Sequence, residues 1–181
     1  MNHFDYSEFA IEIRKDLPAA YAAYWQQLAK PGNWWTGAER VAIALETRNA
    51  LACVFCAKRK QALTPYGVEG EHDHAGVLPE RVVDAVHRII TDQNRITQAL
   101  VDDNAANELS KAAYVELVGI AVTVLSIDEF HRAMGLPVET LPEPVAGEPS
   151  RYMPPTVVSD MWFVPTIPAE GATANEADLW Q

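Results

Sequence analysis

The hydrophobic and polar positions of this chain follow helical spacing over most of its first three quarters. Ala19, Tyr21, Tyr24 and Leu28 recur at three- and four-residue intervals, which predicts a helix that Pro31-Gly32-Asn33 ends. A second predicted helix runs from Thr36 to about Ala50, with Thr36 and Glu39 spaced as a capping box. A third follows directly and runs to Leu63.

The middle of the chain continues this pattern. A helix is predicted from Pro79-Glu80 to about Ile90, because Val82, Val83, Val86, Ile89 and Ile90 form one apolar stripe. A short helix is expected over 96–101, and the longest over 111–134, with Ser110 as its cap and Gly135 near its end. No segment before Pro137 alternates with a period of two, so the expected fold class is all-α.

The pattern changes at Pro137. Eight of the twelve prolines and a net charge of −6 lie between residues 137 and 181. The apolar side chains of this stretch argue against a free tail: Met153, Val157, Val158, Met161, Trp162, Phe163 and Val164. We therefore expect a helical domain over residues 1–136 and an extended arm over 137–181, docked on its own domain or on a neighbouring subunit, with the last ten residues loose.

The charge and the apolar segments of the chain argue against several classes of protein. The formal net charge is −11, which disfavours binding to nucleic acid or to an anionic membrane surface. The longest apolar stretch, Leu117–Leu125, is far short of a membrane span, and residues 1–8 do not resemble a secretory signal. The expectation is a cytoplasmic protein with reduced thiols.

The two cysteines, Cys53 and Cys56, carry the candidate chemistry. They are spaced Cys-x-x-Cys where one helical pattern ends and the next begins, and Lys58, Arg59 and Lys60 follow them. A helix start and nearby cations favour a thiolate, so a redox-active pair is expected. Glu46 precedes Cys53 by two helical turns and is a candidate proton relay.

The sequence also allows two other interpretations of the cysteine pair. A metal site would recruit His72 and His74 in the pattern Cys-x2-Cys-x15-His-x-His, although that spacing is short for zinc, and we expect no metal or other cofactor. The two thiols could also be inert and buried. His87 lies beside the apolar stripe of its helix and is expected to be a structural histidine.

The ordered motifs resemble the alkylhydroperoxidase D-like (carboxymuconolactone decarboxylase) superfamily, in its alkylhydroperoxidase-related branch. Together they cover roughly Trp35 to Tyr152, and they are the runs 48–56, 83–89, 113–119 and 142–152. The resemblance implies an oligomeric helical bundle that reduces hydroperoxides and is reduced in turn by an external dithiol. It also implies that Cys56 attacks the peroxide and Cys53 resolves the sulfenic acid, whereas the position at the helix start favours Cys53 as the nucleophile.

The chain departs from that family at two positions. Lys60 stands where the family's peroxidases have a histidine, and Val41 stands where they have a glutamate. The relay is therefore incomplete or rebuilt, with Lys60 holding the thiolate electrostatically. The sequence predicts a thiol-dependent peroxidase with Cys53, Cys56, Glu46 and Lys60 as site residues; the alternative is a non-catalytic oligomeric scaffold of the same fold.

Overall fold

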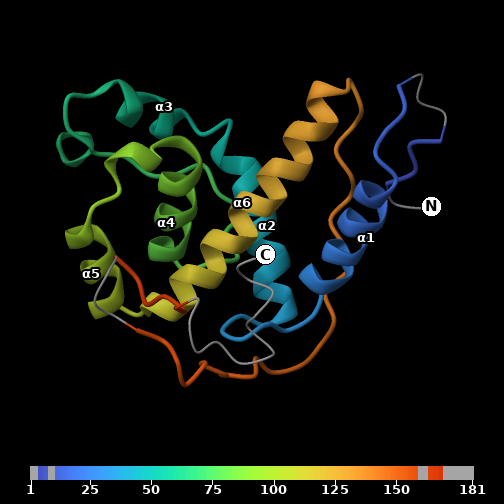
Figure 1. The fold of residues 1–181 in the computed structure, drawn as a ribbon. Helices are drawn as coiled ribbons and strands as arrows, with labels where there is room; N and C mark the ends of the chain where they lie inside the picture. Colours follow the sequence, from blue (N-terminus) through green and yellow to red (C-terminus); the bar gives the residue numbers. More distant parts are fainter. Residues whose placement is uncertain (1–3, 8–10, 159–162, 169–181) are drawn as a thin grey trace.

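The chain folds into helices joined by loops, as a computed structural model shows (Figure 1). The structure describes residues 4–7, 11–158 and 163–168. Within these ranges there is no strand, and the one pairing of extended chain is an isolated bridge between Val158 and Thr166. The predicted all-α fold class is confirmed.

The described residues contain six α-helices and two short 3-10 helices. In chain order they are α1 (Asp16–Leu28), α2 (Gly37–Ala50), α3 (Val54–Gln61), η1 (Pro65–Gly67), α4 (Glu80–Thr91), η2 (Gln93–Arg95), α5 (Gln98–Ala106) and α6 (Lys111–Ala133). Most bounds lie within a residue or two of those predicted from the hydrophobic pattern. The exception is α5, which the pattern placed over 96–101; it begins later because the Thr97 side chain caps it by accepting a hydrogen bond from the Leu100 amide.

The cap residues explain where the other helices start. Thr36 and Glu39 form the predicted capping box of α2: the Thr36 hydroxyl accepts from the Glu39 amide, and the Glu39 carboxylate accepts from the Thr36 amide. Ser110 caps α6 by accepting from the Ala113 amide. Gly135, in a left-handed conformation at φ 70°, follows its last turn.

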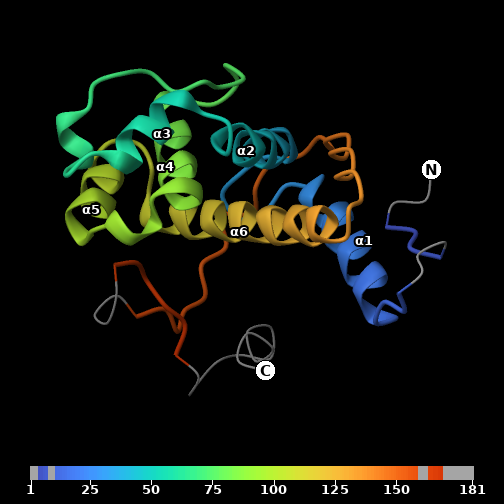
Figure 2. The ribbon, with the colours of Figure 1, turned by 90° about the horizontal axis from the view of Figure 1, so that it is seen from above.

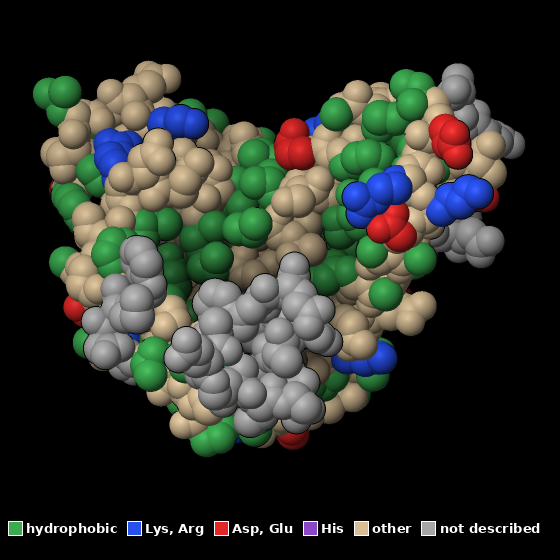
Figure 3. All heavy atoms as spheres, in the orientation of Figure 1, with side chains coloured by type: hydrophobic (Ala, Val, Ile, Leu, Met, Phe, Trp, Pro, Cys, Tyr) green, Lys and Arg blue, Asp and Glu red, His purple; other side chains and the backbone are tan. Residues whose placement is uncertain are grey.

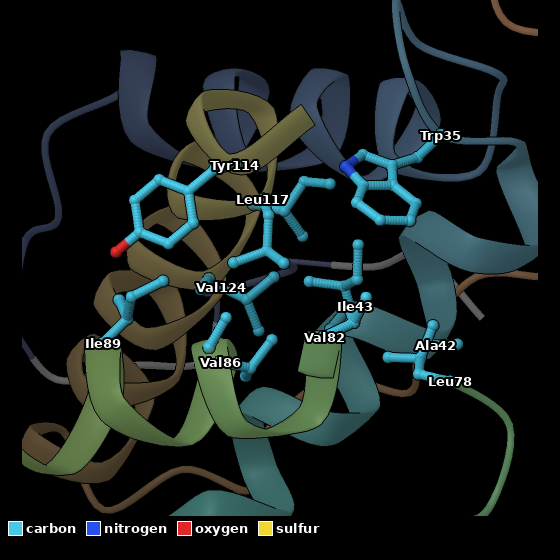
Figure 4. Close-up of a cluster of buried hydrophobic side chains, with 14 of the residues drawn as sticks. Trp35, Ala42, Ile43, Leu78, Val82, Val86, Ile89, Tyr114, Leu117 and Val124 are labelled. Carbon is cyan, nitrogen blue, oxygen red and sulfur yellow. The ribbon is translucent and has the colours of Figure 1, made fainter. Parts of the chain in front are cut away.

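The core forms where α2 and α4 pack on one side of α6 (Figures 1 and 2). Ile43 of α2, Val86 of α4, and Leu117 and Val124 of α6 are completely buried there, and Figure 4 shows their side chains converging. Trp35 lies at one end of this core, and its indole N–H donates a hydrogen bond to the Ala113 carbonyl at 3.0 Å. This packing fixes the α2 and α4 side chains that face α3.

The C-terminal arm runs against the α1–α2 side of the same chain. Backbone amides of Val145, Ser150 and Arg151 donate to the carbonyls of Ala29, Gly32 and Asn33, at 2.7–3.0 Å. The described part of the arm therefore docks on its own domain. Met161, Trp162 and the last ten residues, for which the sequence also raised expectations, lie outside the described residues.

One face of α6 is only partly covered by the described residues: Val115 lines a cavity together with Tyr152 and Met153 of the arm, whereas Val122 is not part of its walls. Val115 and Val122 are 42% and 47% exposed, and Figure 3 shows hydrophobic side chains along this hollowed middle of the molecule. Among the described residues no single helix is long and apolar enough to cross a membrane; α5 and α6 pass such a test only as a pair bent by 116°.

Candidate functional site

The two cysteines lie at the start of α3, as predicted. Cys53 is the N-cap residue, with φ −66° and ψ 118°, and Cys56 lies in the first turn. Both are free thiols, and both are buried, with 3% and 1% of their surface exposed. Asp73, which accepts a hydrogen bond from the Val54 amide at 2.9 Å, satisfies one of the free N–H groups at this helix start.

Two imidazoles face the sulfur atoms, and each comes from a different part of the chain. The Nδ1 atom of His87, on α4, is 3.2 Å from the Cys56 Sγ atom. The Nδ1 atom of His72, on the loop before α4, is 3.4 Å from the same sulfur and 3.8 Å from the Cys53 Sγ atom. The sulfur pair is therefore buried among nitrogen atoms and not only among apolar side chains.

On the side away from the sulfur atoms, the Nε2 atom of each imidazole contacts a carboxylate. The Nε2 atom of His87 is 2.8 Å from Glu46 of α2, and both side chains are buried. The Nε2 atom of His72 is 3.0 Å from Asp84 of α4. Because a carboxylate only accepts hydrogen bonds, we assign the ring proton of both histidines to Nε2, which leaves the Nδ1 lone pairs directed at the thiols.

The ionic environment keeps Asp84 charged. Burial alone would raise the pKa of Asp84, but hydrogen bonds from His72, Arg88 and Arg59 outweigh it and lower that pKa well below its usual range. The carboxylate therefore remains an acceptor for His72 across the pH range in which proteins are normally handled. Arg59 is only 2% exposed, and one of its guanidinium nitrogens lies 3.8 Å from the Cys56 sulfur.

The thiol and the imidazole nearest each other are both neutral at rest. Burial raises the pKa of Cys56 to about 11, and Cys53 adds to this rise while Arg59 opposes it. Burial also lowers the pKa of His87 and outweighs the hydrogen bond that His87 donates to Glu46, which favours the imidazolium. A protonated thiol next to a neutral base is the resting arrangement, not a preformed thiolate.

The loop that supplies His72 is anchored at several points. Besides the Asp73 contact, the Ala75 amide donates to Glu46 at 3.3 Å. The rings of His72 and Phe55 pack edge to face with centroids 5.0 Å apart. A side chain at Gly70 would meet the Phe55 ring at 2.6 Å, so only glycine lets the loop lie this close to α3.

A polar cavity of about 420 Å³ opens beside the site. Its walls include Phe55, Arg59, His72 and Asp84. Arg59 and His72 thus contact Cys56 on one side and line the cavity on the other, so a single layer of side chains separates the buried sulfur from the cavity.

The predicted site residues divide into two groups. Cys53, Cys56 and Glu46 come together, with Glu46 acting on Cys56 through His87 and not directly. Lys60 is exposed in the last turn of α3, and no contact joins it to either sulfur in the described part of the chain. The cation at the thiol is Arg59, because position 59 and not position 60 faces α4 in this helix.

The histidine that contacts Cys56 was not among the predicted site residues. His87 was expected to be a half-buried structural residue; it is completely buried, but it bridges Glu46 and Cys56. Of the two histidines in the metal alternative, only His72 reaches the cysteines; His74 instead accepts a hydrogen bond from the Gly76 amide. The one sequence signal that pointed to His87 was its position beside the apolar stripe of α4.

In comparisons with protein-family models, curated proteins and solved structures, no match to this chain was found. The geometry of the site is therefore the basis for assigning a function.

Proposed function

We propose that the protein is a thiol-dependent peroxidase that reduces a hydroperoxide with the Cys53–Cys56 dithiol and is recycled by an external dithiol. The observation that carries the proposal is the buried chain Cys56–His87–Glu46, with its 3.2 Å and 2.8 Å contacts. It has the order of nucleophile, base and orienting acid that activates a neutral nucleophile. An imidazole from α4 thereby takes the part of the histidine that the resembled family carries at the position of Lys60.

In the first step Cys56 is the attacking residue. His87 Nδ1 takes the thiol proton as the sulfur attacks the peroxide oxygen, and Glu46 stabilises the imidazolium that forms. The O–O bond breaks, the imidazolium returns the proton to the departing alkoxide, and the products are an alcohol and a Cys56 sulfenic acid. This route needs no resting thiolate, in keeping with the raised pKa of Cys56.

In the second step Cys53 is the resolving residue. Its sulfur lies within 4.8 Å of the Cys56 sulfur, and its thiol has its own base in His72, which Asp84 orients. His72 takes the Cys53 proton, the new S–S bond forms as the S–O bond of the sulfenic acid breaks, and the His72 imidazolium protonates the departing hydroxide, which leaves as water. An external dithiol then reduces the disulfide by exchange. The order of attack is that of the resembled family, and the contacts of Cys56 with two imidazoles and Arg59 support it.

Brief exposure of the metal-free, reduced protein to one equivalent of organic hydroperoxide tests the proposal. We expect mass spectrometry to find one internal disulfide, and we expect peroxide consumption with a generic dithiol to stop in Cys56→Ser. Slow over-oxidation without a disulfide, or a rate unaffected by Cys56→Ser, would instead favour the non-catalytic scaffold. The missing histidine at position 60 favoured the scaffold, but His87 places an imidazole at Cys56 from another helix.

The exposed stripe of α6 supports an oligomer of at least two copies. Val115, Gly119 and Val122 lie on one face of the helix, and a side chain added at Gly119 would meet nothing within 4 Å. A second copy could therefore bring its own helix close to this face. Val122→Asp should lower the mass measured by light scattering, while Leu63→Asp, a change at a fully exposed leucine elsewhere, should not. An unchanged mass in Val122→Asp would exclude this face as the interface.

A further inference from the structure

The same four side chains that serve the redox chemistry also form a complete set of ligands for a metal ion. One atom from each of Cys53, Cys56, His72 and His87 lies within 4.8 Å of all the others. A metal needs this convergence of donor atoms, and a thiol relay does not: one imidazole at one thiol would suffice for a relay.

The distances match a tetrahedral zinc site in particular. Zn–S bonds of about 2.3 Å and Zn–N bonds of about 2.0–2.1 Å place tetrahedral ligand atoms about 3.3–3.8 Å from one another. The three recorded sulfur–nitrogen distances are 3.2, 3.4 and 3.8 Å. The remaining pairs lie within 4.8 Å and need to close by at most about 1.5 Å, through small rotations of the cysteine and histidine side chains.

The carboxylates that contact the two histidines also fit a metal site. Metal-bound histidines usually donate their other ring N–H to a carboxylate, which fixes the lone pair on the ligating nitrogen. Both histidines have this partner here, Asp84 for His72 and Glu46 for His87. Two thiolates with one Zn²⁺ carry no net charge, so the buried site is electrically balanced once it is filled.

We propose that the reduced protein binds one Zn²⁺ ion through Cys53, Cys56, His72 and His87. Four protein ligands close the coordination sphere, as in structural zinc sites. The ion ties the start of α3 to α4 and to the loop that carries His72. It also occupies both sulfurs, so the zinc-loaded protein reacts with hydroperoxide more slowly than the metal-free protein.

This proposal goes beyond the peroxidase function and does not require it, because metal binding involves no redox step. The soft thiolates and borderline imidazoles select Zn²⁺ over Mg²⁺ or Ca²⁺, which prefer oxygen ligands. Co²⁺ serves as the spectroscopic probe because it takes the same geometry.

The test is titration of the full-length reduced, metal-free protein with Zn²⁺ and with Co²⁺. We expect one Zn²⁺ per chain by elemental analysis after gel filtration, and visible Co²⁺ bands of a tetrahedral site with thiolate-to-metal charge transfer. In Cys53→Ser and His72→Ala we expect a loss of the Co²⁺ charge-transfer intensity or of the one-to-one Zn²⁺ stoichiometry. His74→Ala, a matched histidine change on the same loop, should keep both. Asp84→Asn leaves all four ligands in place and should weaken Zn²⁺ binding about 10- to 100-fold.

Three results would overturn the proposal: no Zn²⁺ bound by the wild-type protein, an octahedral Co²⁺ spectrum, or Zn²⁺ that binds with the same affinity when Cys53 or His72 is replaced. The wild-type spectrum keeps the test decisive even if a variant does not fold. Peroxide consumption is measured separately, on metal-free protein in chelator. If the protein binds no zinc but forms the disulfide, only the metal site is refuted. If it binds zinc but does not react with peroxide, only the peroxidase function is refuted.

Discussion

Replacement of Glu46 by glutamine isolates the step in which His87 acts as a base. The change keeps the size of the side chain but removes its charge, and the amide can donate to Nε2 of His87. That would move the ring proton to Nδ1, where it faces the Cys56 thiol, and the base would be lost. The metal-free protein should therefore react slowly with hydroperoxide, although both cysteines remain in place.

The size of the effect follows from the contact itself. At 2.8 Å, and with an effective dielectric constant of about 20, a full charge pair between Glu46 and imidazolium is worth about 6 kcal/mol. Desolvation of the two buried groups consumes part of this energy, so we expect a net loss of about 3–5 kcal/mol in transition-state stabilisation. At about 1.36 kcal/mol for each tenfold change, the rate of disulfide formation should fall roughly 10²- to 10⁴-fold, which is the usual contribution of a general base.

The assay is single-turnover disulfide formation with one equivalent of organic hydroperoxide in chelator, quenched by alkylation and read by mass spectrometry. Glu69→Gln, the same chemical change on an exposed glutamate, is the matched control and should react at the wild-type rate. Glu46→Asp retains the charge on a shorter side chain, so its rate of disulfide formation should lie between those of Glu46→Gln and the wild type. If Glu46→Gln forms the disulfide as fast as the wild type while remaining folded by thermal unfolding, the relay is wrong.

Three further outcomes are expected. In Cys53→Ser the Cys56 sulfenic acid cannot be resolved, so a sulfenic-acid trapping reagent should label Cys56 and excess peroxide should over-oxidise it; an unlabelled Cys56 would contradict the order of attack. The pKa of Cys56 is raised from 9.0 to about 11 in the folded protein, so the stability that this thiol contributes is present below pH 9 and lost as the pH rises through 11. Thermal unfolding of metal-free protein should show that decline, and Cys56→Ala should lack it; equal pH profiles would refute the raised pKa. Ile43→Ala removes a completely buried side chain between α4 and α6 and should cost about 2–5 kcal/mol in the free energy of unfolding measured with denaturant; a cost below 1 kcal/mol would mean that this core is not packed as described.

The local features of the fold could be predicted because they are encoded within a few residues. The apolar stripe of Val82, Val83, Val86 and Ile89 predicts α4, and the Thr36–Glu39 pair fixes the start of α2. The position of the Cys-x-x-Cys pair at the start of α3 follows in the same way, from where one helical pattern ends and the next begins. Helical spacing and capping act over three or four residues, so the linear order of side chains is enough to show them.

The contact of His87 with Cys56, and the route by which Glu46 reaches the cysteines, could not be predicted in this way. Glu46 and His87 are 41 residues apart, and they meet only because α2 and α4 pack together on α6. Periodicity alone also could not decide between Arg59 and Lys60, since both follow the pair on a short helix and only the position of α4 selects one of them. By itself the sequence therefore determined the helices and a dithiol at a helix start. The packing of the helices decided which imidazoles, carboxylates and cation surround the sulfurs, because contacts between distant segments depend on how the whole core is filled.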